Sequence, residues 1–144
     1  MTRYLIDSNI VSELAKPLRS PALVDWMGRQ VDEELFIATM TVGEIWRGIL
    51  QLRSGRRRLE LETWFAGPEG PSALFQGRIL PFDVAASMEW ARIMAEGTLA
   101  ARPRGGIDMI IAATAVANDC VVVTANERHF AGVVEFLNPL RDAS

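Results

Sequence analysis

The sequence predicts a three-layer α/β/α protein, in which helices cover both faces of a mainly parallel sheet of about five strands. Short, wholly apolar runs such as residues 35–38 and 121–123 alternate along the chain with longer segments of helical character. Strands that are buried on both faces have such uninterrupted apolar runs. With 144 residues, 49% of them hydrophobic and 23% charged, the chain is expected to form one domain over residues 1–144.

The expected elements follow from local signals along the chain. Five short apolar runs are the expected strands, at residues 4–6, 35–38, 79–82, 121–123 and 133–136. The expected helices lie between them: a short one opening at Ser8 or Asn9, then 20–28, 41–50, 56–65, a long one capped by Asp83, and 107–118. Pro17 ends the first helix and Pro21 opens the second, because proline fits the first turn of a helix but not its interior. Glycine and proline predict loops at 67–71 and 102–106, and the second of these is also basic.

The composition excludes several kinds of site. Cys120 and His129 are the only cysteine and histidine, which rules out an internal disulfide and a zinc site built from several such ligands. No apolar run approaches the ~20 residues that a transmembrane helix needs. Asp7 interrupts the N-terminal segment before the apolar core of a signal peptide could form, so we expect a cytoplasmic protein without membrane association. Its chemistry must then come mainly from carboxylates.

Three acids and an amide stand near the ends of the expected strands. Asp7 ends the first strand, and Glu44 lies in the first turn of the helix after the second. Asp108 lies in the first turn of the helix before the fourth strand, and Asn126 follows that strand. Open parallel sheets bind ligands outside the carboxyl ends of their strands, so these side chains are expected to meet at one edge. No lysine or histidine lies beside the acids in sequence, whereas Mg²⁺ or Mn²⁺ prefers such oxygen ligands.

Each of the three acids also has a purely structural interpretation. Asp7 could cap a helix or form an Asx turn, and Asp108 could simply be favoured by the positive end of a helix dipole. Glu44 could be the reciprocal half of a capping box that begins at Thr41. Their joint placement at one sheet edge favours a functional site over three separate coincidences.

Five segments together resemble the motifs of PIN domains. They are LIDSN at 5–9, TVGE at 41–44, GIDMIIAA at 106–113, VTANERHF at 123–130 and FLNP at 136–139. They occur in order and cover nearly the whole chain, and the last is similar to the tail of the VapC-type toxins, particularly their FitB-like branch. The resemblance implies a metal-dependent endoribonuclease that hydrolyses RNA phosphodiester bonds as the toxin of a type II toxin–antitoxin system.

The resemblance also assigns roles to individual residues. Asp7, Glu44 and Asp108 match the acidic positions that hold Mg²⁺, for which Mn²⁺ can substitute. Asn126 stands at a fourth position that is often aspartate in PIN domains, and Thr124 matches a hydroxyl position at the strand end. The hydroxyl could bond either a ligand carboxylate or the scissile phosphate. The implied partners are an RNA substrate, a VapB-type antitoxin and a second copy of the chain, as a homodimer or within a larger complex.

The basic residues are candidates for contact with RNA. The net charge is −3, but 14 of the 15 lysine and arginine residues are arginine, whose planar fork suits phosphate. Four of these arginines form a cluster: Arg53, Arg56, Arg57 and Arg58. They could bind the RNA backbone, or they could form a solvated helix face paired with Glu60 and Glu62. His129 is assigned a surface or structural role, although it could touch a phosphate.

Two other functions compete with the nuclease. The first is a PIN-like module that binds RNA or protein without cleaving, which the amide at position 126 keeps open. The second is a receiver-type signalling domain, whose chemistry needs an acidic pair after the first strand and a late lysine. Asp7 is followed by Ser8, and Lys16 is the only lysine, so the sequence disfavours this second function. No G-x-G-x-x-G pattern indicates a nucleotide-binding domain.

Overall fold

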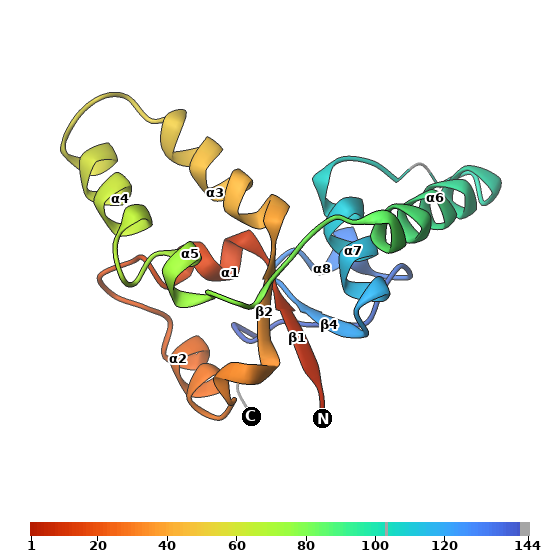
Figure 1. Cartoon of the computed structure of the whole chain (residues 1–144), viewed down its shortest axis with the longest axis horizontal. Helices are drawn as coiled ribbons and strands as arrows, with labels where there is room; N and C mark the ends of the chain where they lie inside the picture. The colour runs from red at the N-terminus through yellow and green to blue at the C-terminus, as the bar shows by residue number, and fades with distance from the viewer. Residues whose placement is uncertain (103, 142–144) are drawn as a thin grey trace.

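The computed structural model describes residues 1–102 and 104–141, and its centre is a five-stranded sheet. The strands are β1 (Arg3–Ile6), β2 (Leu35–Ala38), β3 (Ile79–Leu80), β4 (Cys120–Val123) and β5 (Phe136–Leu137). Their order is β3-β2-β1-β4-β5, and every neighbouring pair is parallel. The predicted α/β class and parallel sheet are therefore confirmed (Figure 1).

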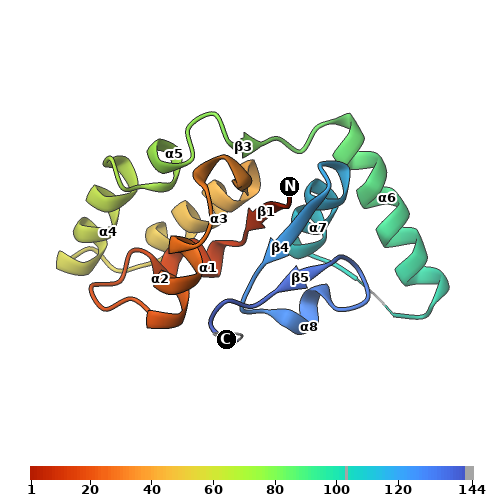
Figure 2. The same ribbon diagram turned by 90° about the horizontal axis from the view of Figure 1, so that it is seen from below.

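Helices surround this sheet and connect its strands. They are α1 (Ser8–Glu13), α2 (Pro21–Gly28), the 3₁₀ turn η1 (Asp32–Glu34), α3 (Thr39–Leu50), α4 (Arg56–Ala66), α5 (Pro71–Leu74), α6 (Val84–Leu99), α7 (Ile107–Ala117) and α8 (Glu127–Phe130). Figure 2 shows α1 to α5 gathered on one side of the molecule and α6 to α8 on the other. None of the described helices is both long and apolar enough to cross a bilayer.

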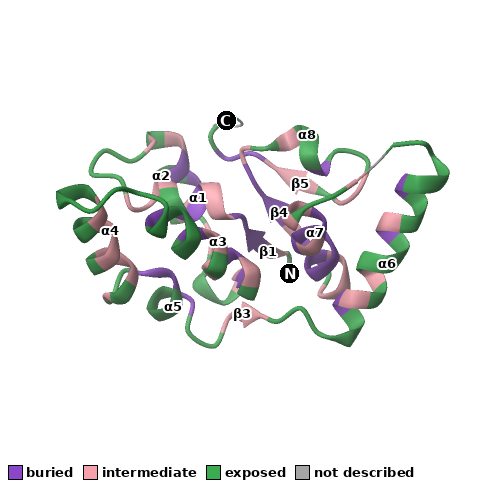
Figure 3. Cartoon of the chain, turned by 90° about the horizontal axis from the view of Figure 1, so that it is seen from above, coloured by how far each residue is buried: buried purple, intermediate pink, exposed green. Residues whose placement is uncertain are grey.

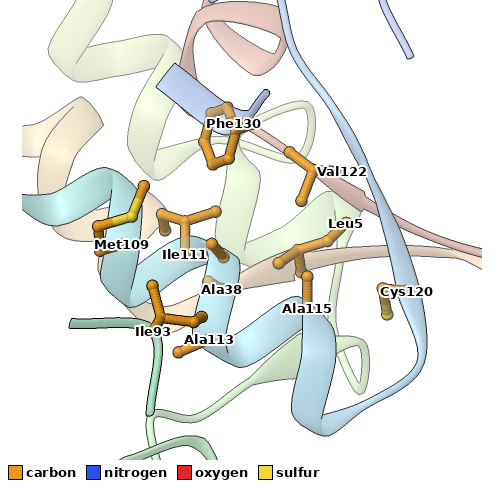
Figure 4. Close-up of a cluster of buried hydrophobic side chains, with 11 residues drawn as sticks. Leu5, Ala38, Ile93, Met109, Ile111, Ala113, Ala115, Cys120, Val122 and Phe130 are labelled. Atoms are coloured by element: carbon orange, nitrogen blue, oxygen red, sulfur yellow. The ribbon is translucent and has the colours of Figure 1, made fainter. Parts of the chain in front are cut away.

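The two faces of the sheet bury two separate apolar cores, because neighbouring residues of a strand point to opposite faces. Leu5 packs with Ile93, Ile111 and Phe130 from α6, α7 and α8 (Figure 4). Ile6 points the other way and packs with side chains of α1, α2 and α3 and with Phe75, which follows α5. Figure 3 shows the result: β1 and β4 are buried at the centre, whereas α4 and the outer side of α6 are exposed. This layered packing fixes the strand ends that carry the site.

Several predicted boundaries are wrong, each for a local reason. The expected strand at 133–136 is a turn followed by β5, because the N–H groups of Val133 and Val134 both bond to the carbonyl of Phe130. Helix α3 begins at Thr39 rather than at Thr41, directly after β2. Part of the expected loop at 67–71 leads into α5, which opens at Pro71. Pro103, within the expected loop at 102–106, lies outside the described residues.

Candidate active site at the ends of the strands

Asp7 is the most deeply buried acid of the site, with 1% of its surface exposed. It follows β1 and caps α1, and its Oδ1 accepts a hydrogen bond from the N–H of Ser8 at 2.9 Å. Its Oδ2 accepts from the Nδ2 of Asn9 at 3.0 Å and from the hydroxyl of Thr124 at 2.8 Å. Because β1 and β4 pair Ile6 with Val123, the next residues of the two strands, Asp7 and Thr124, are neighbours.

Burial raises the pKa of the Asp7 carboxyl above its ordinary value, and the charge of Asp108 raises it further. The hydrogen bonds from Thr124, Ser8 and Asn9 act in the opposite direction, because they favour the charged form. The capping interpretation of Asp7 is therefore correct as a local description, but it accounts for only one of its three hydrogen bonds. The other two join the carboxylate to a second strand end and to the α1 side chain at position 9.

Asn9 ties the loops after β1 and β4 together, a role that its place in the sequence did not reveal. Its Oδ1 accepts from the N–H of Ala125 at 3.0 Å while its Nδ2 donates to Asp7. The hydroxyl of Thr124, fully buried, in turn accepts from the N–H of Asn126 at 3.0 Å. Only the pairing of β1 with β4 brings these residues together. The one sequence signal was the LIDSN segment, in which Asn9 stands two residues after Asp7.

Glu44 lies in the second turn of α3, since that helix begins two residues earlier than expected. Its Oε1 is buried and has no hydrogen-bond partner among the described residues. Burial raises the pKa of Glu44, and the negative charges of Asp7 and Asp108 raise it further. The capping-box interpretation is wrong: Thr41 is an interior residue of α3, and its buried hydroxyl likewise lacks a partner within the described chain.

Asp108 lies in the first turn of α7, as expected, and is paired with His129 of α8. The Nδ1 of His129 lies 2.6 Å from Oδ2 of Asp108, and about half of the histidine side chain is exposed. No lysine or histidine lies beside the acids in sequence, but the packing of α7 against α8 brings His129 to Asp108.

Asn126 is exposed and precedes α8, and its side chain does not cap that helix. It lines a cleft of about 330 Å³ together with Glu44, Asn9, Arg57 and Trp64, which we call the Glu44 cleft. Asp108 and His129 line a different cleft, described below. As the side chains stand, no three histidine, cysteine, aspartate or glutamate side chains of the described residues are grouped closely enough to hold one ion together.

The arginine cluster divides between the two interpretations. Arg56 lies 3.2 Å from Glu60, and Arg58 lies 2.8 Å from Glu62, as a solvated helix face would have them. Arg57 is exposed and lines the Glu44 cleft, with only a 3.9 Å contact to Glu60. Arg53 is exposed and lies between α3 and α4. Of the four arginines, Arg57 is the one that the fold brings to the acids.

Comparison with known proteins agrees with this geometry. The family model described as "PIN domain" matches residues 4–135. A protein named VapC ribonuclease Y4jK, from Sinorhizobium fredii, is 34% identical over 140 residues, covering 96% of this chain and 99% of its own. Toxin FitB from Neisseria gonorrhoeae is 30% identical over 139 residues, with the same coverage. The crystal structure of FitAcB from Neisseria gonorrhoeae superposes with a TM-score of 0.84 at 29% identity, covering 96% of this chain and 99% of that one. The chain belongs to the PIN domain family.

Proposed function

We propose that this chain is a metal-dependent endoribonuclease and the toxin of a type II toxin–antitoxin pair, contained in one domain. The observation that carries the proposal is the unpartnered, buried oxygen of Glu44 beside the charges of Asp7 and Asp108. A buried polar atom without a partner is costly, so its retention indicates that a ligand completes its coordination. Relatives named VapC ribonuclease and Toxin FitB support the same activity.

A divalent cation fits this set of oxygen donors. Asp7, Glu44 and Asp108 would hold Mg²⁺, or Mn²⁺ in its place, because these hard ions prefer carboxylate oxygens. Binding requires a side-chain rotation, since the three acids are not yet grouped around one point. Glu44 can make this rotation, because its buried Oε1 has no hydrogen bond within the described residues that the rotation would break. When bound, such an ion lowers the pKa of a water and stabilises charge on the phosphate.

The protein side chains contribute positioning and proton transfer. Asp7 is held in one orientation by Thr124 and Asn9, and this favours the first of the two roles weighed for the threonine hydroxyl, a bond to a ligand carboxylate. Glu44, whose pKa is raised by burial, would accept a proton from the attacking water more readily than an exposed carboxylate. Asn126 would orient a water or a phosphate oxygen through its amide.

The proposed partners are an RNA strand, a VapB-type antitoxin and a second copy of the chain. An arginine of the antitoxin entering the acidic site would replace the cation there. Trp46 and Leu50 of α3 are partly exposed and are candidate contact residues for either protein partner. The neighbouring side chain Ile49 is buried and does not belong to that surface. Co-expression with the antitoxin, expected to be encoded by the neighbouring gene, should therefore abolish the activity of the toxin.

The test is cleavage of RNA by purified protein, compared with the Asp108→Asn variant. We expect wild type to cut RNA in Mg²⁺ or Mn²⁺, EDTA to stop it, and the variant to be strongly impaired while remaining folded. Sequencing the RNA ends after brief expression of each protein would identify the cleavage site. Binding of RNA without cleavage in either metal would instead identify a PIN-like binding module, the alternative left open by the amide at position 126.

A further inference from the structure

A second cleft is lined by Asp108 and is strongly basic. It has a volume of about 460 Å³ and lies between α7, α8 and the loop that precedes α7. Its lining includes the ionisable residues Arg102, Arg104, Asp108, Arg128 and His129. We call it the Asp108 cleft. Three arginines therefore line the same cleft as one aspartate, in a protein whose net charge is negative.

Two of the three arginines have guanidinium groups available to a ligand. Arg104 is engaged in the fold: its Nη1 donates to the carbonyl of Ile93 at 2.9 Å, and Glu96 lies 3.9 Å away. Arg102 and Arg128 are exposed and make no side-chain hydrogen bond or salt bridge within the described residues. Elsewhere on the surface, Arg56, Arg58 and Arg92 are each paired with a glutamate.

The position of Arg102 is built into the packing of the loop against α6. Its N–H donates to the carbonyl of Gly97 at 2.8 Å. A Cβ at position 97 would lie 2.9 Å from the carbonyl oxygen of Arg102 and from two side-chain carbons of Arg104. Glycine at this point of α6 therefore permits the close approach that holds the loop beside the cleft, where Figure 2 shows the chain returning from α6 to α7.

We propose that the Asp108 cleft binds the ribose-phosphate backbone of RNA on one side of the scissile bond, with Arg102 and Arg128 pairing with two successive phosphates. The inference rests on the proposed function, because the reacting phosphate must lie at Asp7, Glu44 and Asp108. A strand leaving that point past Asp108 enters this cleft at once. Guanidinium groups bind phosphate through paired hydrogen bonds, and outside the acidic centre they replace the cation as the source of positive charge.

The proposal favours RNA over an acidic peptide. Only a ligand with one phosphate at the metal centre and further phosphates along the same chain uses the acidic centre and the adjoining arginines together. A peptide rich in glutamate would bind the arginines alone, and the carboxylates of the centre would repel its remaining charges. The two ligands therefore differ in whether the metal ion strengthens their binding.

The experiment measures binding of a fluorescent single-stranded RNA across a salt series, in the Glu44→Gln background and in EDTA, so that cleavage does not consume the strand and the two arginines are measured apart from the metal. The test variant is Arg102→Gln with Arg128→Gln. The control is Arg19→Gln with Arg29→Gln. These two substitutions remove the same charge at two exposed arginines that line neither cleft. Thermal unfolding verifies that both double variants fold. Whether wild type cleaves RNA is measured separately, so failure of the nuclease assignment and failure of this site give different results.

Each phosphate contact contributes ~0.7 to the slope of log affinity against log salt for single strands, so losing two should flatten it by about 1.4. Raising salt from about 50 to about 200 mM should then weaken the intact protein roughly sevenfold more than the test variant. The control should keep the intact slope. Equal slopes for test and control variants would overturn the proposal, as would absence of RNA binding with all arginines present. Oligoglutamate that competes as well as RNA, and depends on the same two arginines, would overturn it in favour of a peptide site.

Discussion

Replacing Glu44 by glutamine should stabilise the metal-free protein while removing its response to the metal. In the wild type, the buried Oε1 has no partner, and the charges of Asp7 and Asp108 stand close enough to raise the Glu44 pKa. The glutamine side chain keeps the size of glutamate but removes one of three interacting negative charges. It breaks no hydrogen bond to Oε1, because none is present among the described residues. The folded state should therefore gain stability.

The size of the gain follows from the cost of an unsatisfied buried group, ~1–3 kcal/mol and more when it is charged. Glutamine keeps one unpartnered polar atom, and Glu44 is only partly buried, so a gain of about 1 kcal/mol is expected. For a chain of this length, 1 kcal/mol moves the midpoint of thermal unfolding by about 3 °C. With metal at about 100 times its Kd, the wild type should instead gain ~2.7 kcal/mol, or about 8 °C. The variant should gain little.

The same acids set the pH dependence of the metal-free protein. Burial raises the pKa of both Asp7 and Glu44 in the folded state, so the folded protein holds these protons more tightly than the unfolded chain does. Their contribution to stability is present below the unfolded values, 3.8 for the aspartate and 4.5 for the glutamate. It is lost as pH rises through the raised folded values. Glu44→Gln should reduce that loss and leave the share due to Asp7.

The assay is thermal unfolding of wild type and Glu44→Gln in EDTA at several pH values, repeated with a Mg²⁺ or Mn²⁺ titration. Glu60→Gln is the matched control, because Glu60 is an exposed glutamate on α4 paired only with surface arginines. A metal-free Glu44→Gln protein that is less stable than wild type at neutral pH would refute the electrostatic reasoning. A full metal-induced shift in that variant would show that Glu44 is not a ligand.

Substitutions at four further residues test individual roles. Thr124→Val removes the hydroxyl donor to the Asp7 carboxylate, so the free energy of unfolding measured in urea should fall by ~1.5–3 kcal/mol. The Asp7 pKa should rise further, so the acidic limb of the pH–activity profile should move to higher pH. His129→Ala should raise the metal concentration needed for half-maximal cleavage, whereas His129→Asn keeps a donor close to the Nδ1 position and should restore it; equal behaviour would deny the histidine a positioning role. Arg57→Gln should raise the KM for RNA with little change in kcat, which steady-state kinetics would reveal. An unchanged KM would mean that Arg57, like Arg56 and Arg58, belongs to a solvated helix face that does not contact RNA. Asn126→Ala should retain more cleavage at saturating metal than any alanine variant of the three acids, because an amide supplies no charge to a cation; the reverse order would mean that the ligands are misassigned.

The part of the site at the strand ends, Asp7 and Thr124, could be predicted because the pairing of parallel strands that are buried on both faces determines which residues meet at their ends. Once residues 4–6 and 120–123 are neighbouring parallel strands, the residues after them must meet, and Asp7 lies beside Thr124 for that reason alone. The apolar runs carry this information directly. The fold class was predictable on the same basis, since it depends on alternation over the whole chain rather than on any one boundary.

The part of the site carried by helices, Glu44 and Asp108, was harder to predict from the sequence, because several residues near a helix end fit the local signals equally well. Thr39 and Thr41 are both acceptable at a helix start, and only the direct junction with β2 makes Ala38 the cap and moves Glu44 into the second turn. The contact between His129 and Asp108 joins two helices whose packing no periodicity encodes. Val133 and Val134 have strand propensity, yet the turn after α8 uses their N–H groups before the chain can enter the sheet.

The three acids therefore differ in how firmly the fold holds them, and this difference suggests how the site captures a cation. Asp7 accepts two hydrogen bonds from the start of α1 and one from Thr124 at the end of β4, and it is fully buried, so its orientation is fixed by the fold. Among the residues that the structure describes, Asp108 is paired with His129 alone, and the buried Oε1 of Glu44 has no hydrogen-bond partner. If a cation binds here as proposed, Asp7 would hold it without moving, whereas Asp108 and Glu44 would have to rotate toward it about side-chain bonds while their helices constrain the backbone. Metal binding should accordingly alter the side-chain signals of α3, α7 and α8 in an NMR titration and leave β1 and β4 almost unchanged. Large shifts in the strands would show instead that the sheet edge itself rearranges.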